Sequence, residues 1–481
     1  MTRPPARTSS RRGRPAAGRR WSSAADRCGR IGAPIRRPVS IGGMAERWLY
    51  GWGLGSVALG GASLVVPLYV VELGGGPVVL GVLAAVAAFV GVPAALGAGR
   101  IADRTGKRRA IVLGMLALVA VSIGVTPLFD RALPVIVANG AIWFAFAAAT
   151  PVLTLLAVAD VPENVWSERI ALLNQYQGIG WALGLLLGAV WTALASRFLP
   201  ADAVIRWLFV PLTVCAVLGL LLGIRTLPAD PGPRADRRAS GDRVRRAIRN
   251  ADRFSVRTAA FPFTVGRADF RGLHPRRFVE RFTPALAVYF AAVFCFFTGF
   301  AAFFAPLPAF LTEVGFGSDG VFALYLINGL ASAAFFGVAG RLTAGHDVER
   351  LQIGSLSVRA IALPAIALAG GAWGTSAVGF GVVAAIFAVI GVTWAVIAVT
   401  AGTLVTRLSP PTVRGEALGT YAALGALAGG IGSVLGGRLA AVSYVVAFGA
   451  AGVLVLAGAG MVLLVRRYNA AVAPTDGISA T

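Results

Sequence analysis

Twelve long apolar segments constrain this sequence more than any other feature. A membrane-spanning helix needs about 20 mostly apolar residues, because the hydrocarbon core is about 30 Å thick and a helix rises about 1.5 Å per residue. The segments cover approximately residues 48–72, 76–98, 110–129, 133–159, 170–195, 204–224, 284–312, 319–340, 352–372, 376–404, 415–438 and 442–465. They are continuously apolar, whereas the strands of a membrane barrel alternate over about ten residues. The sequence therefore predicts an all-α, polytopic membrane protein with twelve transmembrane helices.

The composition supports this fold class. Hydrophobic residues make up 57% of the 481 residues and charged residues 14%, whereas a soluble globular chain is about half apolar and a quarter charged. Ordinary cytosolic enzymes and disordered proteins are therefore excluded. The net charge of +23 comes largely from arginines in residues 1–43 and 225–282, outside the apolar segments. Arginines placed there flank a membrane domain, so no nucleic-acid partner is predicted.

Polar, arginine-rich stretches divide the chain into five predicted parts. These are a basic N-terminal extension, a six-helix half, a cytoplasmic linker, a second six-helix half and a tail, at residues 1–47, 48–224, 225–283, 284–465 and 466–481. Positively charged connections stay on the cytoplasmic side of a membrane. Only Arg131, Arg197, Arg206 and Arg438 would fall on the outer side, so a cell-membrane location with both termini in the cytoplasm is expected.

The sequence leaves open the nature of two of these parts. The extension has no apolar signal segment, and it reads as a basic tail, as a transit-like presequence or as untranslated sequence. Met44 stands directly before the first apolar segment, which favours Met44 as the start; an intact mass of the native protein tests this. The linker is either a solvated loop or a basic amphipathic helix on the inner leaflet.

The residue types required for catalysis or metal binding are scarce. His274 and His346 are the only histidines, and Cys28, Cys215 and Cys295 are far apart in the sequence. Neither a catalytic set nor a metal-ligand cluster can be assembled from them, so no enzyme, metal or cofactor is predicted. The sequence also has no phosphate-binding loop, which argues against ATP as the energy source.

The two sets of six segments carry an internal repeat. An offset of about 245 residues pairs Arg169 with Arg414, Tyr176 with Tyr421, Gly180 with Gly425 and Gly184 with Gly429. Parallel repeats of this kind build transporters from two pseudo-symmetric halves, with the substrate path between the halves. Small residues recur every four positions at Gly180, Gly184 and Gly188, and at Gly425, Gly429, Ser433 and Gly437, and such spacing predicts close helix packing.

The connection between the second and third segments, GRIADRTGKRR at residues 99–109, resembles the signature of the major facilitator superfamily. That signature has a glycine, then an aspartate with a basic neighbour, then a glycine with two basic residues. The matching residues here are Gly99, Asp103, Arg104, Gly106, Lys107 and Arg108. The resemblance implies a secondary transporter that works by alternating access.

The resemblance also implies a cytoplasmic gate that closes in the outward-facing state. In that gate Asp103 would cap the eleventh helix near Gly415, and Arg104 would pair with Asp160. The expected gate residues are Gly99, Asp103, Arg104, Gly106, Lys107, Arg108, Asp160, Arg169 and Arg414.

Polar and aromatic residues in the helices that the resemblance places around the path are candidate substrate contacts. They are Asn139, Trp143, Tyr176, Gln177, Tyr289, Tyr325, Asn328, Trp394 and Tyr421, with Gln177 and Asn328 foremost. Each is also compatible with packing alone. Arg359, in the ninth segment, is expected to extend to the cytoplasmic face. With no carboxylate near the membrane midplane, the cavity is expected to be poor in charge and to favour a neutral or amphipathic solute.

The expected partners are a small-molecule substrate and membrane lipids, with a proton or sodium ion as the candidate coupling ion. Export of amphipathic compounds is the first functional hypothesis. The alternatives are uptake of a metabolite and a transport-inactive sensor or lipid-handling protein.

Overall fold

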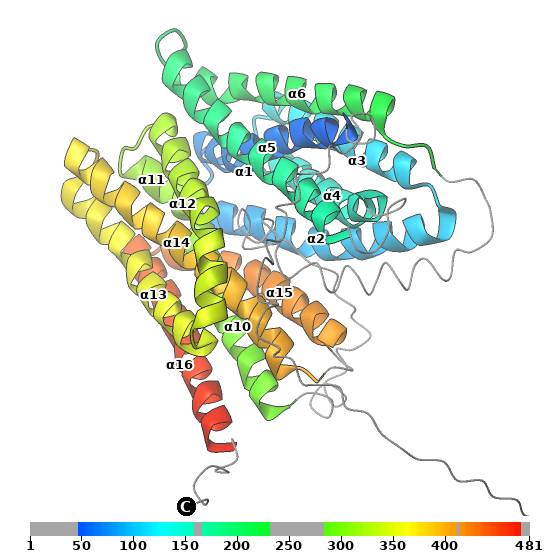
Figure 1. Ribbon diagram of the computed structural model, residues 1–481. Helices are drawn as coiled ribbons and strands as arrows, with labels where there is room; N and C mark the ends of the chain where they lie inside the picture. Colours follow the sequence, from blue (N-terminus) through cyan, green and yellow to red (C-terminus); the bar gives the residue numbers. More distant parts are fainter. Residues whose placement is uncertain (1–46, 158–165, 231–282, 411–413, 473–481) are drawn as a thin grey trace, which may run out of the picture. The chain divides into compact units, whose positions relative to one another are not determined.

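The computed structural model describes residues 47–157, 166–230, 283–410 and 414–472, all within one compact unit, Met44–Thr481. The described residues form helices and turns and contain no strand (Figure 1). Twelve candidate membrane spans are present in them, as predicted. The all-α, twelve-helix prediction is therefore confirmed.

The helices keep the labels of Figure 1. The first half consists of α1 (Arg47–Glu72), α2 (Pro77–Thr105), α3 (Arg108–Val125), the short 3-10 helix η1 (Thr126–Leu128), α4 (Ala132–Ala157), α5 (Trp166–Ala195) and α6 (Ala201–Thr226). The second half consists of α10 (Pro284–Phe304), α11 (Leu307–Glu313), α12 (Ser318–Gly345), α13 (Val348–Trp373), α14 (Ala377–Leu408), α15 (Arg414–Ala440) and α16 (Tyr444–Val472).

Two differences from the predicted segments have local causes. The seventh segment is two helices, α10 and α11, which are separated at Ala305 and Pro306; proline cannot donate the backbone hydrogen bond that would continue the helix. Helices α2 and α12 continue past their apolar segments to Thr105 and Gly345, because helical hydrogen bonding does not end where the apolar sequence ends.

Helix packing repeats between the halves. In the first half α1 packs against α5 and α6, α2 against α4, and α3 against α4 and α6. In the second half α10 packs against α15 and α16, α12 against α14, and α13 against α14 and α16. The two sets of contacts correspond helix by helix, which confirms the pseudo-symmetric halves.

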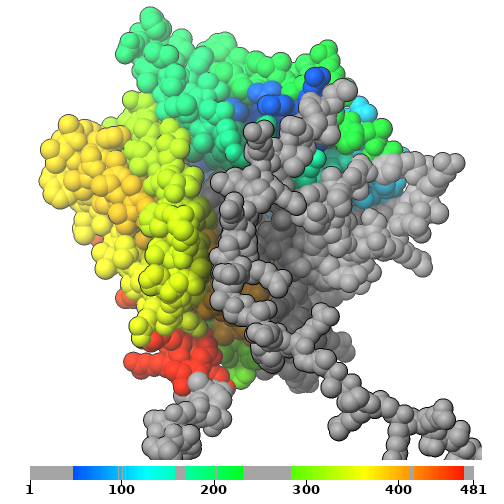
Figure 2. Space-filling model, in the orientation of Figure 1, coloured from blue at the N-terminus to red at the C-terminus, as the bar shows by residue number. Residues whose placement is uncertain are grey.

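Burial separates the central helices from the surface helices. The apolar windows of α1 and of the span formed by α10 and α11 are 78% and 72% buried, whereas that of α12 is 22% buried, the lowest of the twelve spans. Helix α12 is accordingly visible at the surface, in yellow-green, on the face seen in Figure 2. Exposed apolar side chains such as Ile361 and Leu368 of α13 suit a lipid environment, since lipid does not penalise them as water would.

Glycines allow the central helices to touch along their backbones. A Cβ on Gly184 of α5 would collide with the carbonyl oxygen of Val57 in α1, and a Cβ on Gly436 of α15 would collide with that of Ala302 in α10. Gly180 likewise approaches the carbonyl oxygen of Gly53. The close packing predicted for Gly180 and Gly184 is confirmed.

The halves meet through α2 with α15 and α5 with α12, and the glycine contacts between them cluster at one end. A Cβ on Gly81 would lie 2.5 Å from the carbonyl oxygen of Ser433, and one on Gly437 would lie 2.5 Å from that of Pro77. Gly188 similarly abuts the ring of Phe322. This is the end at which α2 and α12 begin.

At the opposite end, the same helices leave space beside their glycines. Among the described residues, a Cβ on Gly97 or Gly99 of α2, or on Gly345 of α12, would meet no atom within 4 Å. The glycine contacts between the halves therefore lie at the end where α2 and α12 begin, and α2 and α15 also pack together further along, where Val92 contacts Ala423 and Ala426.

Asp347 starts α13 and joins it to the end of α16. Its carboxylate accepts from the backbone N–H of Arg350 at 3.0 Å and from Nε of Arg466 at 3.0 Å. Partial burial alone would raise the pKa of this carboxyl, but these hydrogen bonds outweigh it and lower the pKa below the ordinary value of 3.8. Ionised Asp347 therefore stabilises the folded protein.

We expect Asp347→Ala to reduce stability by about 1 kcal/mol, the typical effect of losing a helix N-cap. Because the folded-state pKa is lowered, the stabilisation is complete above the unfolded-state pKa and is lost as the pH falls through the folded-state pKa. Melting temperatures measured across pH in detergent should show a gap between wild type and variant that narrows below about pH 4. Asp319→Ala, which removes an exposed acid of α12, should have a smaller effect. An equal effect would exclude the capping role.

Candidate functional site

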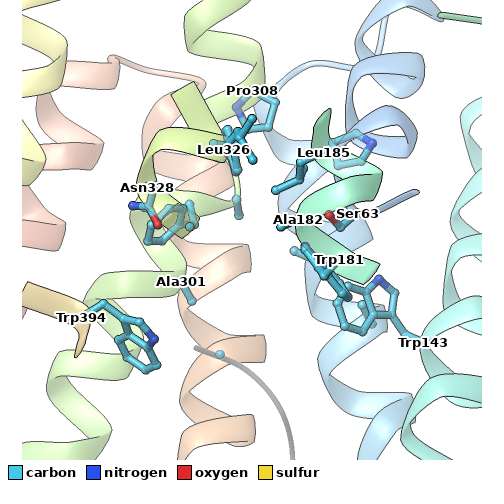
Figure 3. Close-up of a pocket in the computed structure, with 18 of the residues that line it drawn as sticks. Ser63, Trp143, Trp181, Ala182, Leu185, Ala301, Pro308, Leu326, Asn328 and Trp394 are labelled. Carbon is cyan, nitrogen blue, oxygen red and sulfur yellow. The ribbon is translucent and has the colours of Figure 1, made fainter. Parts of the chain in front are cut away.

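A cavity of about 470 Å³ lies between the two halves near the middle of the helices. Side chains from α1, α2, α4, α5 and from α10 to α15 line it, and most of them are apolar. Figure 3 shows Trp143 and Trp181 of the first half on one side and Asn328 and Trp394 of the second half on the other. The volume falls within the range of pockets that bind small organic molecules.

The structure places five of the nine predicted contact residues in the cavity wall. These five are Asn139, Trp143, Tyr325, Asn328 and Trp394. The Asn328 side-chain amide also donates to the carbonyl oxygen of Phe387 at 3.3 Å, which orients it between α12 and α14.

The other four predicted residues are not among the described residues that line the cavity. Gln177 is buried on the side of α5 away from Gln175, which does line it. The helical period explains this, because residues two apart on a helix are rotated by about 200° and point in nearly opposite directions.

The three remaining tyrosines pack against neighbouring side chains. The Tyr289 hydroxyl accepts from Gln352 Nε2 at 2.9 Å, inside the second half. The Tyr176 ring stands edge-on to Tyr50 at 5.2 Å between centroids, and the Tyr421 ring lies 5.9 Å from Phe297.

An aromatic cluster forms the first-half wall. The Trp143 ring centroid lies 6.2 Å from that of Trp181 and 6.0 Å from that of Phe146. Trp181 was not predicted as a cavity residue. The available signal was its residue type, because it is an aromatic side chain on α5, one of the helices that the resemblance places around the path.

Arg359 was also missed, and the expectation that it reaches the cytoplasmic face is wrong. It lies eleven residues after Val348, about 16 Å along α13 at about 1.5 Å per residue, too deep for the side chain to reach the helix end. Its exposed fraction is 1%, and it contributes to the cavity wall. The cavity therefore contains a positive charge, which corrects the expectation of a charge-poor site.

The structure describes the side chains of only some of the predicted gate residues. Gly106 has φ +71°, ends α2 and donates its N–H to the carbonyl oxygen of Ala102 at 3.0 Å, a left-handed cap that favours glycine. Lys107 and Arg108 begin α3, and Arg109 donates its backbone N–H to Asp230 at 2.7 Å, beyond the end of α6. The loop therefore couples α2, α3 and α6.

The remaining gate residues are placed only in part. Gly99 lies in the last third of α2, and Arg169 is the fourth residue of α5. Asp160 and the side chains of Asp103, Arg104 and Arg414 lie outside the described part of the structure. Their pairing therefore stays a prediction.

Two pseudo-symmetric six-helix halves around a central cavity define the class of polytopic membrane transporters built from parallel repeats. A family model described as Major Facilitator Superfamily matches residues 1–184 and 135–433. The chain belongs to the major facilitator superfamily.

Solved structures with the same fold transport different solutes. The chain is similar to the nucleoside transporter NupG (11% identity, TM-score 0.64), covering 89% of this chain and 99% of that one. A POT family transporter in complex with a thioalcohol-conjugated peptide gives 14% identity and TM-score 0.60 over 89% and 96% of the two chains. The human organic anion transporter MFSD10 (TETRAN) gives 18% identity and TM-score 0.50 over 88% and 97%. No curated protein matches the chain. At these identities the likeness defines the fold alone.

Proposed function

We propose that this protein is a secondary transporter that carries a small amphipathic organic solute by alternating access of its two halves. The observation that carries the proposal is the cavity of about 470 Å³ at the interface of the halves. Its wall is mainly apolar and aromatic, with a few amide and hydroxyl groups such as Asn139, Asn328 and Ser63. Such a wall suits a solute with a large apolar body and few polar groups.

The contacts between the halves support an inward-facing state. The glycine contacts of α2 with α15 and of α5 with α12 lie at the end that the arginine distribution assigns to the outside. Glycines toward the other end of α2 and α12 have open space beside them. In this proposal a solute enters and leaves the cavity from the cytoplasm in this state.

Ligand binding and transport test the proposal. The full chain, purified in detergent, is screened by thermal stability against organic acids, nucleosides, sugars, amino acids, lipids and drugs. A ligand at a hundredfold excess over its dissociation constant stabilises by about 2.7 kcal/mol. Each stabilising compound is then tested for counterflow in proteoliposomes, with and without proton and sodium gradients.

Counterflow of a stabilising compound is the expected result, and the gradient that accelerates it identifies the coupling ion. The orientation of that gradient distinguishes export from uptake. Binding without counterflow would support a transport-inactive protein. A folded, monodisperse sample that binds nothing and transports nothing would overturn the proposal.

We further propose that Asp103 helps to close the cytoplasmic gate, and we expect Asp103→Asn to shift the population toward the inward-facing state. A hydrogen bond to a charged group contributes about 1.5–3 kcal/mol, so the outward-facing state should lose at least about tenfold in population. Spin-label distances across the cytoplasmic ends of α2 and α15 measure the shift. Asp319→Asn, at the opposite end of the molecule, is the control. Unchanged distances and transport would exclude Asp103 from the gate.

A further inference from the structure

Arg359 is a cation buried in the middle of α13 with part of its hydrogen-bonding capacity unused. Its Nη1 donates to the carbonyl oxygen of Ile390 at 2.8 Å and lies 3.4 Å from Oγ1 of Thr393, both in α14. Its Nε is buried and has no hydrogen-bond partner. Nε of the guanidinium therefore makes no hydrogen bond to the described part of the chain.

Aromatic rings surround this charge. The guanidinium carbon lies 4.3 Å from the ring centroid of Phe300 and 5.8 Å from those of Phe304 and Trp394. The electron-rich faces of these rings attract a cation without neutralising it. Within the described residues, no carboxylate lies within ion-pair distance of Arg359.

The cavity consequently has an uncompensated positive charge. Arg359 is the only charged side chain among the described residues that line the cavity, and its polar neighbours in the wall are neutral. An ionised group within the membrane is costly unless it is paired, and it commonly marks a substrate or ion pathway. A bound anion would supply the missing partner.

We infer that the cavity binds an organic monoanion whose carboxylate pairs with Arg359 and whose apolar body contacts Trp143 and Trp181. This inference rests on the proposed function and specifies its substrate class. Charge-assisted hydrogen bonds between a guanidinium and a carboxylate are among the strongest in proteins, and Arg359 lies in the cavity wall with its Nε unpaired. The two tryptophans lie across the cavity from Trp394 in Figure 3, where the apolar part of the ligand would extend.

A single cation selects for a single negative charge. A second carboxylate on the ligand would be buried against an apolar wall with no cation to pair with it. Dicarboxylates should therefore bind more weakly than monocarboxylates of the same size. An amine would place a second positive charge beside Arg359 and should be rejected.

Matched probes test the inference on the full chain in detergent. Naphthylacetate and naphthylacetamide have nearly the same shape and differ in charge. We expect wild-type protein to bind naphthylacetate at least about tenfold more tightly, a difference of about 1.4 kcal/mol. Arg359→Gln should remove this preference without weakening naphthylacetamide binding, and Arg359→Lys should retain part of it. Arg438→Gln, at the exposed end of α15, should leave the preference unchanged.

A purely structural Arg359 gives a different pattern. Arg359→Gln would then lower the melting temperature and weaken both probes equally. Should Arg359→Gln fail to fold, comparing the binding of the two probes to wild type and to Arg359→Lys still tests the anion site. Equal binding of the two probes to wild type, or binding of neither, would overturn the anion site. Transport of a neutral compound from the wider screen would leave the proposed function intact in either case.

Discussion

Leucine in place of Gly437 is expected to abolish transport while leaving the protein folded. Gly437 of α15 faces α2 across the interface between the halves, and a Cβ there would lie 2.5 Å from the carbonyl oxygen of Pro77 and 3.1 Å from Cα of Gly81. Both neighbours are backbone atoms, so α2 and α15 would have to separate. Overpacking of this kind costs about 3 kcal/mol, which corresponds to about a hundredfold loss of the closed arrangement at this end.

The halves can relieve this clash by opening at that end, because the proposed alternating access includes such an opening. We therefore expect an unchanged melting temperature and counterflow below about a tenth of wild type. Access to the cavity reports the trapped state. A Ser63→Cys reporter in a background without Cys28, Cys215 and Cys295 should react faster with an impermeant thiol reagent added outside cells.

The control is Gly460→Leu in α16, where a Cβ would meet no atom within 4 Å. It introduces the same side chain on an exposed position of a membrane helix and should transport like wild type. Normal counterflow by Gly437→Leu would show that the contact between α2 and α15 does not form during the transport cycle.

Alanine in place of Gly184 should instead destabilise the fold. A Cβ on Gly184 would strike the carbonyl oxygen of Val57 and lie 2.6 Å from the backbone nitrogen of Gly61, both in α1. Helices α1 and α5 belong to the same half, so no step of the proposed transport cycle separates them. We expect a loss of about 3 kcal/mol, seen as a lower melting temperature and a lower yield of monodisperse protein.

Gly114→Ala in α3 is the matched control. Gly114 is exposed in a helix, and a Cβ there would meet no atom within 4 Å. Its melting temperature should equal or exceed that of wild type, since alanine favours helix more than glycine does. Gly436→Ala, the corresponding contact with Ala302 in the second half, should resemble Gly184→Ala. Equal melting temperatures for Gly184→Ala and Gly114→Ala would contradict the packing argument.

The two glycines show how position determines the type of effect. Gly184 joins helices within one half, and Gly437 joins helices that would separate and reunite in the proposed transport cycle. The four-residue spacing predicted close packing for both. It contained no information on which helix would be the partner, because helices of the same half and of the other half present similar small residues.

The sequence likewise predicted some of the cavity residues and not others. Asn139, Trp143, Tyr325, Asn328 and Trp394 line the cavity, and their residue types and helices were sufficient to nominate them. Gln177 was nominated on the same grounds, but its side chain faces away from that of Gln175. The nomination failed because the sequence does not define how a helix is rotated about its axis. Trp181 and Arg359 depended on that rotation in the same way.

The sequence by itself determined that the protein lies in a lipid bilayer, that its fold is all-α and that it contains an internal repeat. The number of long apolar segments sets the number of spans. Each segment must be a helix, because backbone N–H and C=O groups without hydrogen bonds are too costly in lipid. The loop at residues 99–109 and the offset of about 245 residues indicated the family and its two halves. These features are local or periodic, so they can be read without knowing which helices touch.

Only the tertiary structure decided the charge of the cavity and the closed end of the interface. Arg359 is equally compatible, as a sequence position, with the lipid side and with the interior of the protein. Packing of α13 against α14 turns its guanidinium inward to Ile390, and Phe300 covers it. The physical reason is that an arginine about 16 Å from the helix end cannot reach water along the lipid face, whereas carbonyl groups, aromatic rings and a cavity are available inside.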